Sequence, residues 1–218
     1  MAKKVICALA IALCAVMSAF SQDNDFKTNT VLIYVGPQFS TAKATGGITG
    51  KFSYLAGLQY ERNFLKMCGV YVGAEYTSKG TNNFTFLDGR QDDYCLNYVQ
   101  MNLGLKFAKE IWGIDGFVNA GPYLSYGIGG ECTVNGHEMD ESSFDDLSIS
   151  SGMIYTDGGC GFNKFDAGIN VAVGAEYRGF RLMFGYQQGL MNIADDNLIS
   201  NGYKNYGFYA KVGYGFSF

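Results

Sequence analysis

The chain has 218 residues, with 16 Lys and Arg against 20 Asp and Glu and a formal net charge of −4. Without a basic surplus, nucleic acid is excluded as a partner. The chain holds 17 Phe, 16 Tyr and 30 Gly but only two Pro and one Trp. Aromatic residues favour strands, and glycine lets strands curve and crowd in a narrow barrel. The composition therefore predicts an all-β protein.

Residues 1–21 have the layout of a secretory signal peptide. Lys3 and Lys4 supply a positive start, residues 5–20 carry no charge, and small residues precede the break. The apolar run is shorter than the ~20 residues that a spanning helix needs. We therefore predict export through a cleaved signal peptide, which leaves one domain of residues 22–218.

Eight runs with alternating apolar and polar residues follow along the chain. A period of two is typical of strands with two different faces. A strand of ~13 residues at ~3.3 Å per residue is ~43 Å long, and a tilt of ~45° reduces its span to ~30 Å, the thickness of a bilayer hydrocarbon core. The runs are residues 30–39, 52–62, 69–78, 94–107, 116–128, 164–178, 180–190 and 206–218.

The connections between these runs alternate in length. Short turns at one rim and long loops at the other are typical of bacterial outer-membrane barrels. An even number of strands puts both termini at the short-turn rim, which then faces the periplasm. The short connections are residues 63–68, 108–115 and 178–180, and the long ones are residues 40–51, 79–93, 129–163 and 191–203.

The alternation alone does not say which face meets lipid, because a soluble barrel places its apolar face inward. Here, however, the polar face is rich in glycine and carries both signs of charge at matching depths, and tyrosines recur near strand ends, where they can sit at the headgroups. The charges are Glu61, Glu75, Asp166 and Glu176 against Lys106, Arg178, Arg181 and Lys211, and the tyrosines are Tyr94, Tyr98, Tyr177 and Tyr206.

We therefore predict a closed eight-stranded antiparallel up-and-down transmembrane β-barrel in the outer membrane of a Gram-negative bacterium. Closure follows because lipid offers no hydrogen bonds to an open sheet edge. Side chains fill the interior of an eight-stranded barrel, so the inward charges should form a packed ion-pair network. A general porin is disfavoured, since porins use ~16–18 strands.

Five segments carry a family resemblance: YTSKG (76–80), LNYVQMNLGLKF (96–107), GPYLSYGIGG (121–130), FDAGINVAVGAEY (165–177) and the closing GYGFSF. With these segments the mature chain resembles the PorT-like outer-membrane barrel proteins of Bacteroidetes. The resemblance implies an eight-stranded outer-membrane barrel with a C-terminal aromatic residue. PorT itself is associated with protein secretion across the outer membrane. Many members have a carboxylate-Ile-Pro segment where this chain has Gln100, Met101 and Asn102, so the secretion role is not carried over.

Three aromatic residues close the chain: Tyr214, Phe216 and Phe218. They resemble the signal by which the barrel assembly machinery recognises its clients, and a last strand facing lipid accounts for the same residues. The expected partners are outer-membrane lipid, the barrel assembly machinery and an unidentified extracellular or periplasmic partner.

An acidic segment is the candidate for metal binding. Residues 131–163 contain seven Asp and Glu and no Lys or Arg. Clustered carboxylates can bind calcium or magnesium, but the spacing fits no known calcium loop, and a solvated acidic loop is the alternative. The weak candidates for metal ligands are Glu138, Asp140, Glu141, Asp145 and Asp146.

Cys132 and Cys160 bracket the same segment. We predict a disulfide between them, which closes a loop of about 29 residues and is worth ~3 kcal/mol or somewhat more. Free thiols are the alternative, and Cys95 is a rival partner. Cys68 belongs to a short turn and should lie a membrane thickness from the other three.

His137, with Ser142 or Ser143 and Asp140, supplies the residue types of a hydrolytic triad, but these residues lie outside any predicted strand. The sequence has neither a phosphate-binding glycine loop nor zinc-ligand spacing. We therefore expect no cofactor and a non-enzymatic outer-membrane protein with a structural or surface-interaction role. The alternatives are a component of protein export or envelope assembly, and a lipid-modifying enzyme with its site at the rim.

Overall fold

The computed structural model describes residues 29–42, 50–65, 67–85, 91–135, 147–149, 155, 162–193 and 204–218. The strands in these ranges are β1 (Asn29–Ala42), β2 (Lys51–Leu65), β3 (Cys68–Thr85), β4 (Gln91–Ile111), β5 (Ile114–Asn135), β6 (Leu147–Ile149), β7 (Phe165–Tyr177), β8 (Phe180–Gly189) and β9 (Asn205–Ser217). Within the same ranges, no helix has the length and apolarity to cross a membrane.

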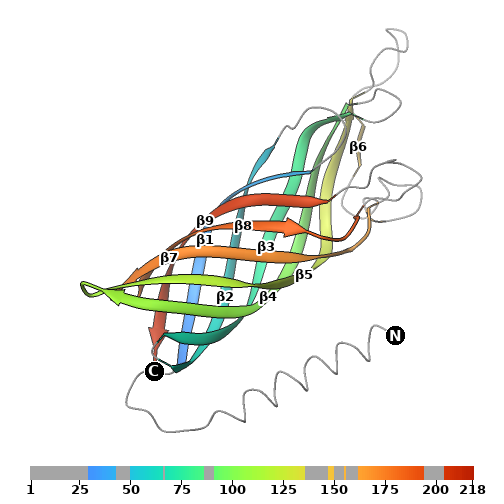
Figure 1. The fold of residues 1–218 in the computed structure, drawn as a ribbon. Helices are drawn as coiled ribbons and strands as arrows, with labels where there is room; N and C mark the ends of the chain where they lie inside the picture. The colour runs from blue at the N-terminus through green and yellow to red at the C-terminus, as the bar shows by residue number, and fades with distance from the viewer. Residues whose placement is uncertain are drawn as a thin grey trace, which may run out of the picture.

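Eight of these strands form a closed antiparallel barrel, which confirms the predicted fold (Figure 1). Each strand pairs with its neighbours in chain order, and β9 pairs with β1 from Thr30↔Ser217 to Ala42↔Asn205. The remaining strand, β6, is not part of the closed barrel. It is short and pairs only with the C-terminal end of β5. Because β1 and β9 close the sheet, the backbone groups of the wall find partners within the wall itself, as a lipid environment requires.

Two of the short connections are two-residue turns. Trp112 and Gly113 join β4 to β5, and Arg178 and Gly179 join β7 to β8, all four with positive φ. Positive φ at both central residues is typical of the type I′ hairpin turn, whose twist matches that of the strands and which favours glycine. The turn at Arg178 was predicted, whereas the predicted connection 108–115 was too long, because β4 and β5 continue to the turn itself.

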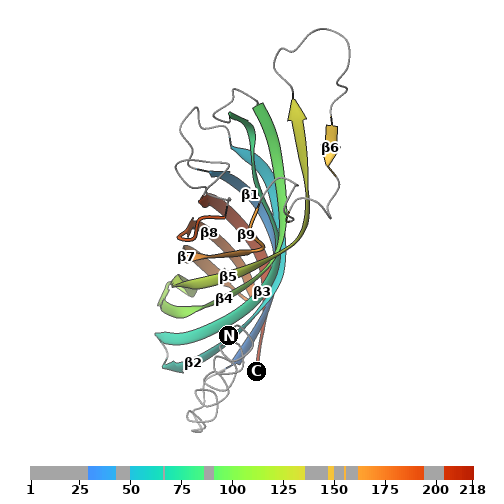
Figure 2. The ribbon, with the colours of Figure 1, turned by 90° about the vertical axis from the view of Figure 1, so that its right-hand side faces the viewer.

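The predicted long loops were also too long in part. Residues 79–85 and 91–93 belong to β3 and β4, and β5 continues to Asn135 instead of ending near Ile128. Figure 2 shows β5 and β6 rising beyond the barrel wall at the long-loop end. Strands that leave the bilayer need no apolar face, so the alternation disappears while the backbone pairing continues.

The predicted inverted orientation of the two faces is confirmed. Along β1, Ile33 and Val35 point outward and are 52% and 53% exposed, while Leu32 and Tyr34 point inward and are buried. The inward face is mostly polar, and Arg181 is the largest fully buried side chain. The prediction that Tyr98 lies at the lipid headgroups is wrong, because its side chain is buried in the lumen.

Glycines on the inward face leave room for aromatic rings. A Cβ atom at Gly185 would lie 2.2 Å from the Tyr209 ring. One at Gly168 would lie 2.7 Å from the Tyr123 ring and 2.1 Å from the carbonyl oxygen of Gln188. Such distances are well inside van der Waals contact, so only glycine fits beneath these rings. The crowded lumen predicted from the glycine-rich face is thereby explained.

Candidate functional site

The first cluster of luminal charges lies toward the short-turn end and centres on Glu61. Lys106 donates to Glu61 Oε2 at 2.7 Å, and both terminal nitrogens of Arg181 donate to the same carboxylate. Arg181 also pairs with Glu176, and Gln59 Nε2 donates to Glu61 Oε1 at 2.7 Å. The fully buried Glu61 carboxylate is therefore neutralised by two cations.

The second cluster lies farther along the lumen and centres on Glu75. Lys211 Nζ donates to Glu75 Oε2 at 2.6 Å, and the hydroxyl of Tyr34 donates to the same oxygen at 2.8 Å. Gln100 Nε2 donates to Glu75 Oε1 at 2.8 Å, and Gln187 Nε2 does so at 3.4 Å. Both carboxylate oxygens are thus saturated by luminal donors.

The third cluster joins Lys79 to Asp166, with 3.4 Å between Nζ and Oδ2. Asp166 Oδ2 also accepts hydrogen bonds from the Tyr123 hydroxyl at 3.3 Å and from Asn205 Nδ2 at 3.1 Å. Lys79 Nζ lies 4.2 Å from the centre of the Tyr123 ring, a cation–π contact between buried side chains.

Gln100 connects the second and third clusters. Its amide nitrogen donates to Glu75, while its carbonyl oxygen accepts from Lys79 Nζ at 2.8 Å and from the Ser125 hydroxyl at 2.9 Å. A carboxylate at this position could accept from Lys79 but could not donate to Glu75. The departure from the carboxylate-Ile-Pro segment therefore fits the luminal network of this chain.

The predicted network is confirmed for seven of its eight residues and corrected at one. Arg178 lies in the exposed β7–β8 turn and takes no part in it. Lys79 is instead the fourth cation of the network. It lies within the predicted long connection 79–93, but in the structure it continues the inward positions of Glu75 and Thr77 along β3. The polar residues at every second position from Glu75 to Lys79 are the sequence signal that could have identified Lys79 as luminal.

Tyr155 lies over the long-loop end of the lumen. Its ring packs edge-on against Tyr98, with centroids 6.5 Å apart, and its hydroxyl donates to the carbonyl of Gly129 at 3.2 Å. Burial raises the pKa of the Tyr155 hydroxyl above its usual range. This ring therefore lies beyond the three clusters, at the long-loop end of the lumen.

The remaining candidate sites fall outside the described residues. This holds for residues 1–21, for the acidic candidates from Glu138 to Asp146, for His137, Ser142 and Ser143, and for Cys160. Across the ranges that the structure describes, no group of three or more His, Cys, Asp or Glu could hold a metal ion. Cys68 and Cys95 are free thiols. The disulfide between Cys132 and Cys160 stays a prediction.

The closing aromatic residues all face outward. Tyr214, Phe216 and Phe218 are exposed on the barrel wall, and the rings of Tyr214 and Phe216 lie 4.9 Å apart. The backbone of Phe218 exchanges hydrogen bonds with Asn29, at 2.9 and 3.1 Å, so the end of the chain completes the seam with β1. Recognition of these residues by the assembly machinery stays a proposal.

Residues 16–195 match the family model for the outer membrane protein beta-barrel domain. The chain belongs to this family. Membership in this barrel family places it in the outer membrane, with the exposed apolar wall toward lipid. The match is to the broad family, so PorT-like membership stays a prediction. A search of curated proteins finds no match.

Several solved structures are similar to this chain. Ail from Yersinia pestis is 15% identical with a TM-score of 0.44, over 87% of this chain and 99% of that one. OprG from Pseudomonas aeruginosa is 12% identical with a TM-score of 0.46, and the similarity covers 88% of this chain and 96% of that one. A major outer membrane protein from Thermus thermophilus is 10% identical with a TM-score of 0.48, and the similarity covers 86% of this chain and 99% of that one. These similarities are too low to transfer a ligand or an activity.

Proposed function

We propose that the protein is a non-enzymatic outer-membrane barrel that holds a projecting sheet outside the cell for contact with a surface partner. The observation that supports this proposal is that three strands extend beyond the closed barrel wall. The pairing of β5 with β7 ends at Tyr126↔Phe165, whereas β5 stays paired with β4 as far as Gln91↔Asn135. The ends of β3, β4 and β5 therefore form a sheet beyond the closed wall (Figure 2).

The buried ion pairs of the lumen support a scaffold in preference to a conduit. The carboxylates of Glu61, Glu75 and Asp166 are buried. Each accepts hydrogen bonds from at least two donors. Opening a passage would expose or separate these charges, and breaking a buried pair costs about 3–5 kcal/mol. The interior therefore stabilises the wall that carries the projection.

A photo-reactive residue at position 88, between β3 and β4, tests the proposal on intact cells. We expect it to crosslink a neighbour at the cell surface, while the same residue at position 112, in the short turn, captures no surface component. Crosslinks to periplasmic proteins from position 112, with none from position 88, would instead support a role in protein export or envelope assembly.

A shortened variant gives the matched functional control. Thr81 and Tyr94 are paired in register, so residues 82–93 can be replaced by Asn-Gly, which fits a two-residue hairpin turn. The shortened chain should keep its heat-modifiable migration and lose the neighbour captured at position 88. If that neighbour still co-purifies with the shortened chain, the projection is not its binding surface.

A further inference from the structure

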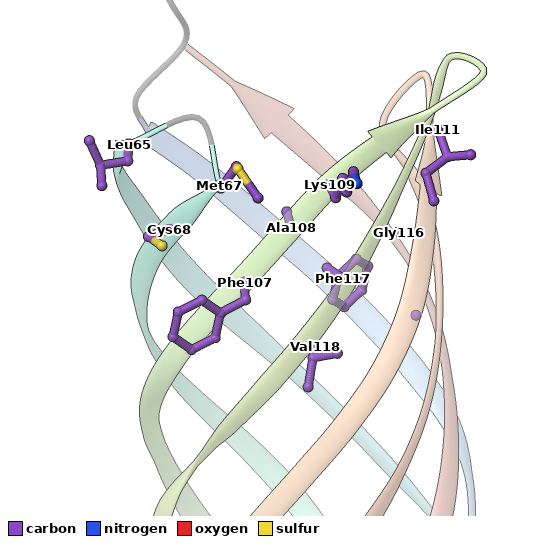
Figure 3. A pocket seen from close by; sticks show the side chains of 11 residues that line it. Leu65, Met67, Cys68, Phe107, Ala108, Lys109, Ile111, Gly116, Phe117 and Val118 are labelled. Atoms are coloured by element: carbon purple, nitrogen blue, oxygen red, sulfur yellow. The ribbon is translucent and has the colours of Figure 1, made fainter.

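The outer wall has an apolar hollow at the short-turn end of the barrel. Its volume is about 880 Å³, and it lies between the β2–β3 turn and the β4–β5 hairpin (Figure 3). Its outward-facing side chains are Leu65, Met67, Phe107, Lys109, Ile111 and Val118. Ala108, Phe117 and Gly174, at inward positions of β4, β5 and β7, form its floor.

The wall has a glycine, Gly116, at the hollow. Gly116 pairs with Lys109 in register, next to the pair Phe107↔Val118. A Cβ atom at Gly116 would meet only the carbonyl oxygen of Lys109, at 3.8 Å. The wall therefore lacks a side chain at this point and would accept one without a clash. This differs from Gly185 in the lumen, which sits beneath the ring of Tyr209.

The hollow opens toward lipid. Phe107, Ile111 and Val118 are about half exposed and continue the outward positions of Leu105 and Leu124 on the same two strands. The hollow is therefore continuous with the lipid-facing wall. Beyond it, at the tip of the hairpin, Trp112 is 99% exposed. Tryptophan is enriched where the headgroups meet the hydrocarbon, so the hollow spans the depth at which an acyl chain joins its headgroup.

A single cation stands at the hollow. Lys109 is the only charged residue among its described lining, and no ion pair within the described ranges involves it. A lysine can keep its stem on an apolar surface while its ammonium group reaches the headgroup layer. An apolar hollow beside one unpaired cation matches an acyl chain that carries a phosphate.

We propose that this hollow binds one phospholipid of the periplasmic leaflet, with an acyl chain over Gly116 and the phosphate at the Lys109 ammonium group. The site is independent of the projecting sheet and of any surface partner. It would hold a defined lipid at the short-turn rim, beside the hairpin that carries the only tryptophan of the chain.

Native mass spectrometry of the purified full-length chain, released from detergent after titration with phosphatidylglycerol, tests the site. The wild-type chain should retain one lipid. Gly116→Leu fills the hollow and should weaken retention about tenfold, because the acyl chain loses its apolar contacts. Ala120→Leu, on the same outward face of β5, is the matched control and should retain lipid like the wild type. Both variants should keep heat-modifiable migration.

The headgroup contact is tested separately. Lys109→Gln should weaken retention of phosphatidylglycerol several-fold and leave retention of diacylglycerol, which has no phosphate, unchanged. Wild-type retention of phosphatidylglycerol by Gly116→Leu would overturn the site and leave the hollow free for a protein partner. An equal effect of Lys109→Gln on both lipids would overturn the role of the phosphate.

Discussion

Replacing Glu61 with alanine is expected to lower the free energy of unfolding by about 3–5 kcal/mol, because it leaves uncompensated charges in the lumen. Lys106 and Arg181 both donate to this carboxylate, and Arg181 is fully buried. Glu176 remains as a partner for Arg181, but it lies 4.0 Å from Lys106 Nζ. One carboxylate would then have to serve two cations.

Urea unfolding of the chain in lipid vesicles, followed by heat-modifiable migration, measures this effect. Glu110→Ala is the control, since Glu110 is an exposed acid on the neighbouring hairpin. The control should unfold within ~0.5 kcal/mol of the wild type, as surface substitutions usually do. If Glu61→Ala unfolds at the same urea concentration as the control, the luminal network does not stabilise the barrel.

Replacing Gly36 with valine is expected to prevent the barrel from closing. Gly36 lies in β1, and a Cβ atom there would come within 1.8 Å of the carbonyl oxygen of Ala210 in β9. That oxygen belongs to the backbone, so the strand itself would have to move. The seam is already weakened here, because Pro37 has no amide hydrogen and the pairing of β1 with β9 is interrupted at these two residues.

The comparison of Gly36→Val with Gly116→Val isolates this steric effect. Both replace a glycine in a barrel strand with the same β-branched side chain, but the position at Gly116 is open. After refolding into detergent, Gly116→Val should give the compact, heat-modifiable form in wild-type yield, and Gly36→Val should give almost none. Equal yields from the two variants would show that the seam tolerates a side chain at Gly36.

The fold was predictable because the strands of a transmembrane barrel alternate apolar and polar residues along the sequence. Within the bilayer, every second side chain must be apolar, so β7 and β9 were recognised almost to their ends. Beyond the bilayer this constraint is absent, and the outer parts of β3, β4 and β5 were assigned to loops. Lys79 was missed for this reason, although it completes the charge balance of the lumen.

Other features depend on contacts that sequence order does not show. Gly36 and Ala210 meet only because the last strand closes on the first, so the sequence around Gly36 does not show this contact. Tyrosine suits both the headgroup level and a polar lumen, so residue type alone does not place Tyr98. In the structure its ring lies in the lumen and packs against Tyr155 from a distant segment. The role of Gln100 likewise follows from having Glu75 and Lys79 on its two sides.

Fluorescence quenching by brominated lipid tests the central claim, that the apolar face of the wall meets acyl chains. Phe184 lies on the outward face of β8 and is 55% exposed. In a Trp112→Phe background, Phe184→Trp places the only tryptophan of the chain on that face. In vesicles, bromine on the acyl chains should quench its fluorescence strongly and aqueous iodide should not. Quenching by iodide alone, from a chain that also stays folded and monomeric without detergent, would contradict the account.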